Sequence, residues 1–183
     1  VTGTVAAPAN PRIEGTAASR SAVTAGPATT RSIGLDSLGA TIDTQYVNYS
    51  GGPVSGALNP VSAGVWIVDA TSSAVRDSMF RGGRSPSCLG AYFGGALGGV
   101  IVQNIDAEAC FGAPAGPASV NAIGTAFDAC PMLSGLPGPA MSNSNSRGGA
   151  VSGANSIAIG VLVSNGCDAS LTNVTATGYT AGA

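Results

Sequence analysis

The stretch GVWIVDATSSAVRDSMFRGG (residues 64–83) has a second copy further along the chain, GVLVSNGCDASLTNVTATGY (residues 160–179). The two align without a gap, so that Gly64 matches Gly160 and Gly82 matches Gly178. Each copy reads as a glycine, a short apolar strand, a polar turn, a second short strand and a glycine. No run is long enough for a helix, and no apolar period of about 3.6 residues is sustained. The repeat therefore predicts a chain of stacked β-units.

Further copies of the repeat begin at other glycines. The series of leading glycines has spacings of 30, 35, 25 and 36 residues along Gly34, Gly64, Gly99, Gly124 and Gly160. Repeats of about 20–50 residues are typical of solenoids, in which each unit buries its apolar face against the next. Alternation along the first strand turns Val65 and Ile67 inward and Trp66 and Val68 outward. We predict an all-β, single-stranded β-solenoid of about five irregular coils with loops of variable length.

Composition supports an ordered solenoid. Of the 183 residues 44% are hydrophobic, but only 5% are aromatic and 9% charged, against about 25% charged in ordinary domains. Disordered chains combine low hydrophobicity with high charge, which is the opposite pattern. The net charge is −2 and the seven basic residues are all arginine, too few and too scattered for a nucleic-acid-binding surface. No stretch approaches the roughly 20 apolar residues of a membrane span.

The four cysteines predict two disulfide bonds. Cys130 lies six residues after Gly124 and Cys167 seven after Gly160, which places both at one corner of neighbouring coils. Coils stack about 4.8 Å apart, within reach of a disulfide. By elimination Cys88, in the loop SPSCLGAYFGG, pairs with Cys110. Disulfides indicate an extracellular or cell-surface location, and a start at Val1 without methionine suggests a processed chain or a piece of a longer one.

The two aligned stretches, residues 64–83 and 160–179, resemble the coil of the right-handed parallel β-helix superfamily, the pectate-lyase-like solenoids, in its non-enzymatic bacterial surface or secreted form. The resemblance covers most of residues 33–179 and implies a right-handed parallel β-helix over residues 33–183. Residues 1–32, rich in Ala, Thr and Pro, match poorly. We expect them to cap the solenoid or to join subunits, because the end of a solenoid exposes unpaired strand edges.

Enzymes of this superfamily use calcium held by Asp with an Arg or Lys base, or paired acids. The nearest equivalents here form no recognisable catalytic pattern: Arg76, Asp77, Arg81, Arg84, Asp106 and Glu108. We therefore expect no enzymatic activity, with these residues solvated or in ion pairs between coils. The glycine-rich GGALGGV (residues 94–100) has no lysine to complete a phosphate-binding loop, and no cofactor is expected.

One turn position recurs in the repeat. We expect a column of Asp and Asn side chains at one corner of the stacked coils, formed by Asp69, Asn104, Asp128 and Asn165, with a shorter second column of Asp77 and Asn173. Asp and Asn tolerate the left-handed backbone conformation that such corners need. Calcium binding is the alternative reading. Half of the main column is Asn and the calcium-binding repeat GGxGxDxUx is absent, so we expect no metal site.

Three aromatic residues are the candidate ligand-binding or subunit-contact residues: Trp66, the only tryptophan, with Tyr92 and Phe93 in the Cys88 loop. They could instead cover a coil beneath a loop. The expected function is an extracellular structural or adhesive solenoid that assembles into fibres, with copies of itself or a cell-surface polymer or glycan as partner. The alternatives are a carbohydrate-binding module and a calcium-dependent polysaccharide lyase.

Overall fold

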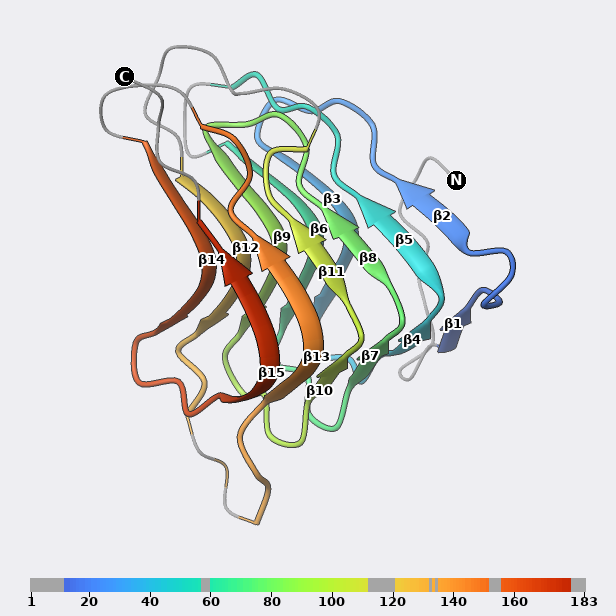
Figure 1. Cartoon of the computed structure of the whole chain (residues 1–183), viewed down its shortest axis with the longest axis vertical. Helices are drawn as coiled ribbons and strands as arrows, with labels where there is room; N and C mark the ends of the chain where they lie inside the picture. Colours follow the sequence, from blue (N-terminus) through green and yellow to red (C-terminus); the bar gives the residue numbers. More distant parts are fainter. Residues whose placement is uncertain are drawn as a thin grey trace.

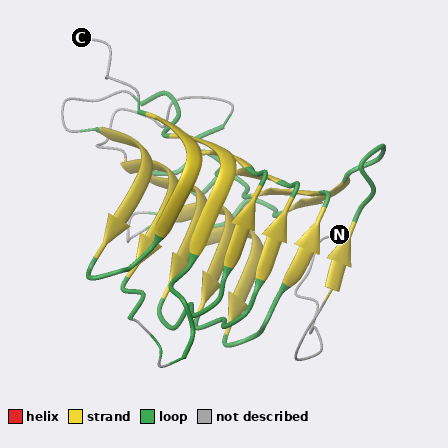
Figure 2. Ribbon diagram, turned by 60° about the horizontal axis from the view of Figure 1, so that its bottom comes forward, coloured by secondary structure: helices red, strands yellow, loops and turns green. Residues whose placement is uncertain are grey.

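The computed structural model of the protein describes residues 12–56, 60–111, 121–131, 133, 135–151 and 156–178. The described residues form an all-β solenoid of about five turns, without a helix (Figures 1 and 2). The predicted parallel β-solenoid is therefore confirmed. Its strands are β1 (Arg12–Glu14), β2 (Ser21–Thr24), β3 (Arg31–Leu38), β4 (Asp43–Gln45), β5 (Val47–Ser50), β6 (Val61–Val68), β7 (Ala74–Arg76), β8 (Met79–Arg81), β9 (Ser87–Gly94), β10 (Ile101–Gln103), β11 (Asp106–Glu108), β12 (Asn121–Asp128), β13 (Ala140–Arg147), β14 (Ile157–Ser164) and β15 (Ser170–Thr177).

Two parallel sheets face each other along the solenoid (Figure 1). The five-stranded sheet has the order β14-β12-β9-β6-β3, and each coil contributes one eight-residue strand to it. The ten-stranded sheet takes two short strands from each of the first coils, separated by a bend, and the single long strands β13 and β15 from the last two. β1 and β2 pair in parallel with β4 and β5. The ladders thus begin within the predicted N-terminal segment, and no break in the sheets coincides with residue 32. Residues 1–11 of that segment lie outside the described residues.

A column of glycines crosses the five-stranded sheet. The pairing aligns Gly34, Gly64, Gly90, Gly124 and Gly160. A Cβ atom at Gly34, Gly64, Gly90 or Gly124 would lie 2.5–2.7 Å from the carbonyl oxygen of the next glycine in the column, so no side chain fits there. The choice of Gly99 as the third member is wrong, since Gly99 precedes β10 in the other sheet. Gly90 takes its place, and the loop predicted around Cys88 is the strand β9.

The core lies between the two sheets and repeats from coil to coil. Val65 and Ile67 point inward and are fully buried, as the alternation predicts. Phe93 and Phe127 stack within the same core cluster, with ring centroids 5.2 Å apart. A second, smaller buried cluster is formed by Cys88, Ala109, Cys110, Ala122 and Val151. The largest fully buried side chains are Tyr49, Phe80, Phe93 and Phe127, so aromatic residues share the core with the valines and alanines of the repeat.

The described solenoid ends in strands paired on one side only. β14 and β15 form the edge at one end, and β1, β2 and β3 form the edge at the other. A further coil, of this chain or of another, would pair there. Within the described residues no helix is long and apolar enough to cross a membrane.

Candidate interaction surface

The outward side chains of the five-stranded sheet form a third apolar cluster, separate from the two buried clusters between the sheets. We call this surface the apolar face; its members in mutual contact are Ile33, Val61, Ala63, Trp66, Leu89, Tyr92, Ile123, Ala126 and Leu162. Among the outward positions of these five strands, charges occur only at the margin, at Arg31, Asp36 and Asp128. Ala63, Leu89 and Ala126 are buried by their neighbours, and the other six members are partly exposed. A contiguous, partly exposed apolar surface can mark an interaction site in soluble proteins.

The centre of the apolar face is an aromatic stack. Trp66 on β6 and Tyr92 on β9 are in register, with ring centroids 3.9 Å apart and planes 15° from parallel. The guanidinium carbon of Arg31 lies 4.7 Å from the Trp66 ring centroid, and its Nη2 lies 3.4 Å from Asp36 Oδ2. Arg31 and Asp36 are both exposed, so they form an ion pair at the protein surface. Because Tyr92 and Arg31 occupy the faces of the Trp66 ring, the stack offers mainly ring edges to the outside.

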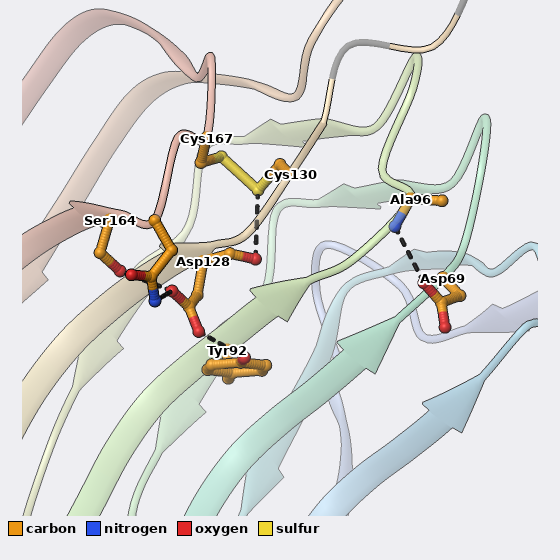
Figure 3. The surroundings of a disulfide bond; sticks show 8 residues. Asp69, Tyr92, Ala96, Asp128, Cys130, Ser164 and Cys167 are labelled. Carbon is orange, nitrogen blue, oxygen red and sulfur yellow. Dashed lines mark hydrogen bonds between the residues drawn. A yellow bond between two sulfur atoms is a disulfide. The ribbon is translucent and has the colours of Figure 1, made fainter.

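Tyr92 is held over its own strand. A Cβ atom on Gly94 would lie 2.7 Å from Cε1 and 2.8 Å from the hydroxyl of Tyr92, so the absence of a side chain at Gly94 makes room for the ring. The Tyr92 hydroxyl donates to Asp128 Oδ2 at 3.0 Å (Figure 3). Ser164 Oγ and Asn165 Nδ2 donate to Asp128 Oδ1 at 2.7 and 2.6 Å. Asp128 therefore ties three successive coils together at the end of the apolar face.

These hydrogen bonds shift the ionisation of both partners. Burial, followed by the hydrogen bond to Asp128, raises the pKa of Tyr92 to about 12. The hydrogen bond from Ser164 is the main cause that lowers the pKa of Asp128, with Asn165 and Tyr92 adding to it against the opposing effect of burial. At neutral pH the pair is thus a neutral phenol donating to a carboxylate, which is the stronger, charge-assisted kind of hydrogen bond.

The three predicted contact residues separate into two groups. Trp66 and Tyr92 lie on the apolar face, and Tyr92 belongs to a strand instead of a loop. Phe93 points the other way, because neighbouring residues of a strand face opposite sides; it is fully buried against Phe127. Its prediction as a surface contact is wrong.

The predicted corner column is divided between two corners. The corner after the five-stranded sheet carries five residues with positive φ, namely Gly39, Asp69, Gly95, Ala129 and Asn165. Asp69 and Asn165 belong to it, and Asp69 Oδ1 accepts from the Ala96 backbone N–H at 2.9 Å (Figure 3). Asp128 precedes this corner by one residue, as the last residue of β12.

Asn104 lies at the other corner, inside the ten-stranded sheet, so its assignment to the first column is wrong. It shares a column of positive φ with Tyr46, Asp77, Asn143 and Asn173. Gln45 and Asn104 both donate to Asp77, at 2.8 and 3.0 Å, and Asn173 donates to Asn143 at 2.8 Å. These side chains bond to one another along the column, which stabilises the bend. In the part of the chain that the structure describes, no group of three or more His, Cys, Asp or Glu side chains could hold a metal ion.

Both predicted disulfide bonds are present. Cys130 and Cys167 are joined at the corner that follows the five-stranded sheet, in neighbouring coils, with Cα atoms 4.1 Å apart (Figure 3). Cys88, near the start of β9, is joined to Cys110, two residues after the end of β11 in the same coil, with Cα atoms 5.2 Å apart.

Several of the charged residues considered for catalysis form ion pairs between coils. Arg76 pairs with Asp43 at 3.2 Å, and Arg147 pairs with Asp106 at 2.9 Å and with Glu108 at 3.8 Å. The Arg81 guanidinium carbon lies 3.9 Å from the Phe111 ring centroid. These arrangements are stabilising contacts along a sheet surface.

Comparison of the chain with protein-family models, with curated proteins and with solved structures finds no match. The apolar face is therefore interpreted from its own geometry. Sequence reasoning missed Arg31, Gly94 and Asp128 as parts of it. The alternation along each strand carries a signal for the outward positions, but the correct register of β9 is needed to align them.

Proposed function

We propose that the protein is an extracellular or cell-surface structural solenoid that associates with copies of itself. Association of many copies builds fibres. The observation that carries the proposal is the apolar face, whose charged outward residues are Arg31, Asp36 and Asp128, on a chain that has few charges to oppose association. The two disulfides support an oxidising location. The repeat supports membership of the right-handed, pectate-lyase-like β-helix superfamily in its non-enzymatic form.

A glycan-binding role is less well supported by the same residues. A sugar ring packs on an open aromatic face, as ligand cations and rings generally do. Tyr92 and Arg31 occupy the faces of Trp66. The flat face around the stack is better suited to another sheet than to a single sugar.

The test compares two isoleucines on opposite sheets. Ile123 lies on the apolar face, whereas Ile101 is an exposed residue of the ten-stranded sheet. Sedimentation velocity over a range of concentrations, with electron microscopy of the native preparation, should reveal self-association of the natural protein. Ile123→Lys should abolish it and Ile101→Lys should leave it unchanged, both with native circular dichroism. A natural protein that stays monomeric at every concentration overturns the proposal.

A further inference from the structure

The outer edge of β15 is one end of the ten-stranded sheet (Figure 1). Among the described strands β15 pairs only with β13, so one side of its backbone faces outward along the stacking direction. Leu171 occupies the inward position that Met141 occupies one coil earlier. Met141 is 1% exposed, whereas Leu171 is 43% exposed. The edge therefore offers a strand backbone and an uncovered core side chain to one further strand.

Five successive coils give this sheet a seven-residue unit with one shared pattern. The first, fourth and sixth residues point inward, and in the four units before β15 they are at most 3% exposed. The third residue has positive φ in every unit. The units are residues 44–50, 75–81, 102–108, 141–147 and 171–177.

Residues 1–7, VTGTVAA, carry the same pattern. Val1 suits the inward first position, and Ala6 suits the sixth, which is alanine in two of the five units. Gly3 falls at the third position, where glycine adopts positive φ without the steric cost of a Cβ atom. Val5 falls at an outward position. The segment therefore fits the strand that would follow β15.

The fourth position adds a hydroxyl to the match. Ser78 Oγ accepts from the Val47 backbone N–H of the preceding coil at 3.2 Å, and Ser144 Oγ accepts from the Ile105 backbone N–H at 3.1 Å. Apolar and hydroxyl side chains thus alternate along this column, in the order Val47, Ser78, Ile105, Ser144 and Val174. The next strand is due a hydroxyl that accepts from the Val174 N–H, and Thr4 supplies it.

The segment cannot reach this edge within its own chain. Residues 8–11 connect it to Arg12 at the start of β1, and the five steps from Ala7 to Arg12 span at most about 18 Å. A strand beyond β15 lies six strand spacings from β1. Six spacings of about 4.8 Å make about 29 Å. The segment that pairs with β15 must therefore come from another copy of the chain.

We propose that residues 1–7 of one copy form the next strand of the ten-stranded sheet of a second copy, parallel to β15, with Val1 over Leu171 and Thr4 over Val174. The inference rests on the proposed self-association: a seven-residue strand alone binds weakly, and the apolar faces raise its effective concentration at the edge. The donor segment and the acceptor edge are different surfaces, so the contact repeats from copy to copy and builds an open fibre.

The test puts one new thiol on each side of the contact, in separate copies of the full chain. Thr2→Cys and Thr172→Cys lie in register on neighbouring strands, within the Cα separation that a disulfide accepts. An equimolar mixture under mild oxidation should give a covalent dimer on non-reducing gels, with the two introduced thiols linked in the peptide map. The matched control replaces Thr172→Cys by Thr177→Cys, about 16 Å further along β15, and should give at least about ten times less dimer.

A second arm tests the register at Gly3. In the copy that carries Thr2→Cys, Gly3→Val should lower the yield of the dimer about tenfold, because a β-branched residue resists positive φ. Gly3→Asn should keep the yield within about threefold, since Asn holds this position in three of the units. Circular dichroism verifies the fold of every variant, and equal yields from Gly3→Val and Gly3→Asn would contradict the register.

The remaining outcomes separate this inference from the proposed function. A link that forms within single chains of the double variant T2C/T172C, and not in the mixture, overturns the exchange between copies. If no link forms while the natural protein self-associates, the added strand is wrong and the proposed function stands. If the natural protein does not self-associate, the proposed function fails and the inference fails with it. Ile123→Lys should remove the link together with the association.

Discussion

Replacing Gly94 by alanine tests the link between the backbone of β9 and the aromatic stack. Gly94 has no left-handed backbone conformation to lose; its added Cβ would instead lie 2.7 Å from Tyr92 Cε1 and 2.8 Å from the hydroxyl. The ring must therefore swing away, which breaks the hydrogen bond to Asp128 and the contact with Trp66.

The magnitude follows from these two contacts. An aromatic pair contributes about 0.5–1.5 kcal/mol, and a hydrogen bond to a carboxylate contributes about 1 kcal/mol when the carboxylate is largely exposed. Alanine in place of a strand glycine returns about 0.5–1 kcal/mol by restricting the unfolded chain. We expect a net loss of about 1 kcal/mol, or about 2–4 °C in Tm for a domain of this size.

The assay uses Trp66, the only tryptophan of the chain. In Gly94→Ala its fluorescence should shift to longer wavelength, because one face of the indole loses its cover. Gly26→Ala is the matched control, since a Cβ atom at Gly26 meets nothing within 4 Å. It should keep the natural emission and be no less stable than the natural protein. An unshifted emission in Gly94→Ala, with stability equal to that of the control, would refute the placement of Tyr92 over Gly94.

Three further predictions concern stability. Phe127→Ala, at a fully buried position, should lower the free energy of unfolding by about 3–5 kcal/mol in urea titrations; a loss under about 1 kcal/mol would contradict its place in the core. Stability should be constant from neutral pH up to about pH 10 and then fall as pH rises towards 12, because the pKa values of Tyr92 and Tyr49 are both raised to about 12 in the folded protein and lie near 10 in the unfolded chain. Thermal scans over this pH range measure the change in stability, and a flat profile above pH 10 would argue against both environments. Replacing Cys130 and Cys167 together by serine should lower the free energy of unfolding by about 4 kcal/mol, as expected for a disulfide that joins residues 37 apart in sequence. Peptide mapping of the natural protein without reductant should find these two cysteines linked to each other. A link from either one to another cysteine would contradict the stacking of the coils.

The error in the third repeat shows where local pattern stops being informative. Residues 100–104, which include β10, read VIVQN, and their alternation resembles that of VWIVD (residues 65–69). Strands of the two sheets share the same local requirements, an apolar inward residue and a polar bend. Only the pairing partner distinguishes them, and Asn104 was consequently assigned to the wrong corner.

The strand β9 was missed for a complementary reason. Its sequence SCLGAYFG contains no β-branched residue, so its intrinsic preference for a strand is weak. Neighbouring strands on both sides supply hydrogen bonds and bury Phe93. Tertiary pairing outweighs propensity here, and with it Tyr92 and Phe93 move from a loop to opposite faces of a sheet.

The sequence by itself determined the stacked β-coils, the inward orientation of Val65 and Ile67 and the two disulfide pairs. Each of these depends on local alternation, on glycines that leave no room for a side chain, or on the near-equal offset of Cys130 and Cys167 from a leading glycine. The tertiary structure decided which residues share a corner, which way Phe93 points and how Trp66, Tyr92 and Asp128 meet. These features depend on the register between coils, and loops of unequal length shift that register by amounts that no single coil encodes.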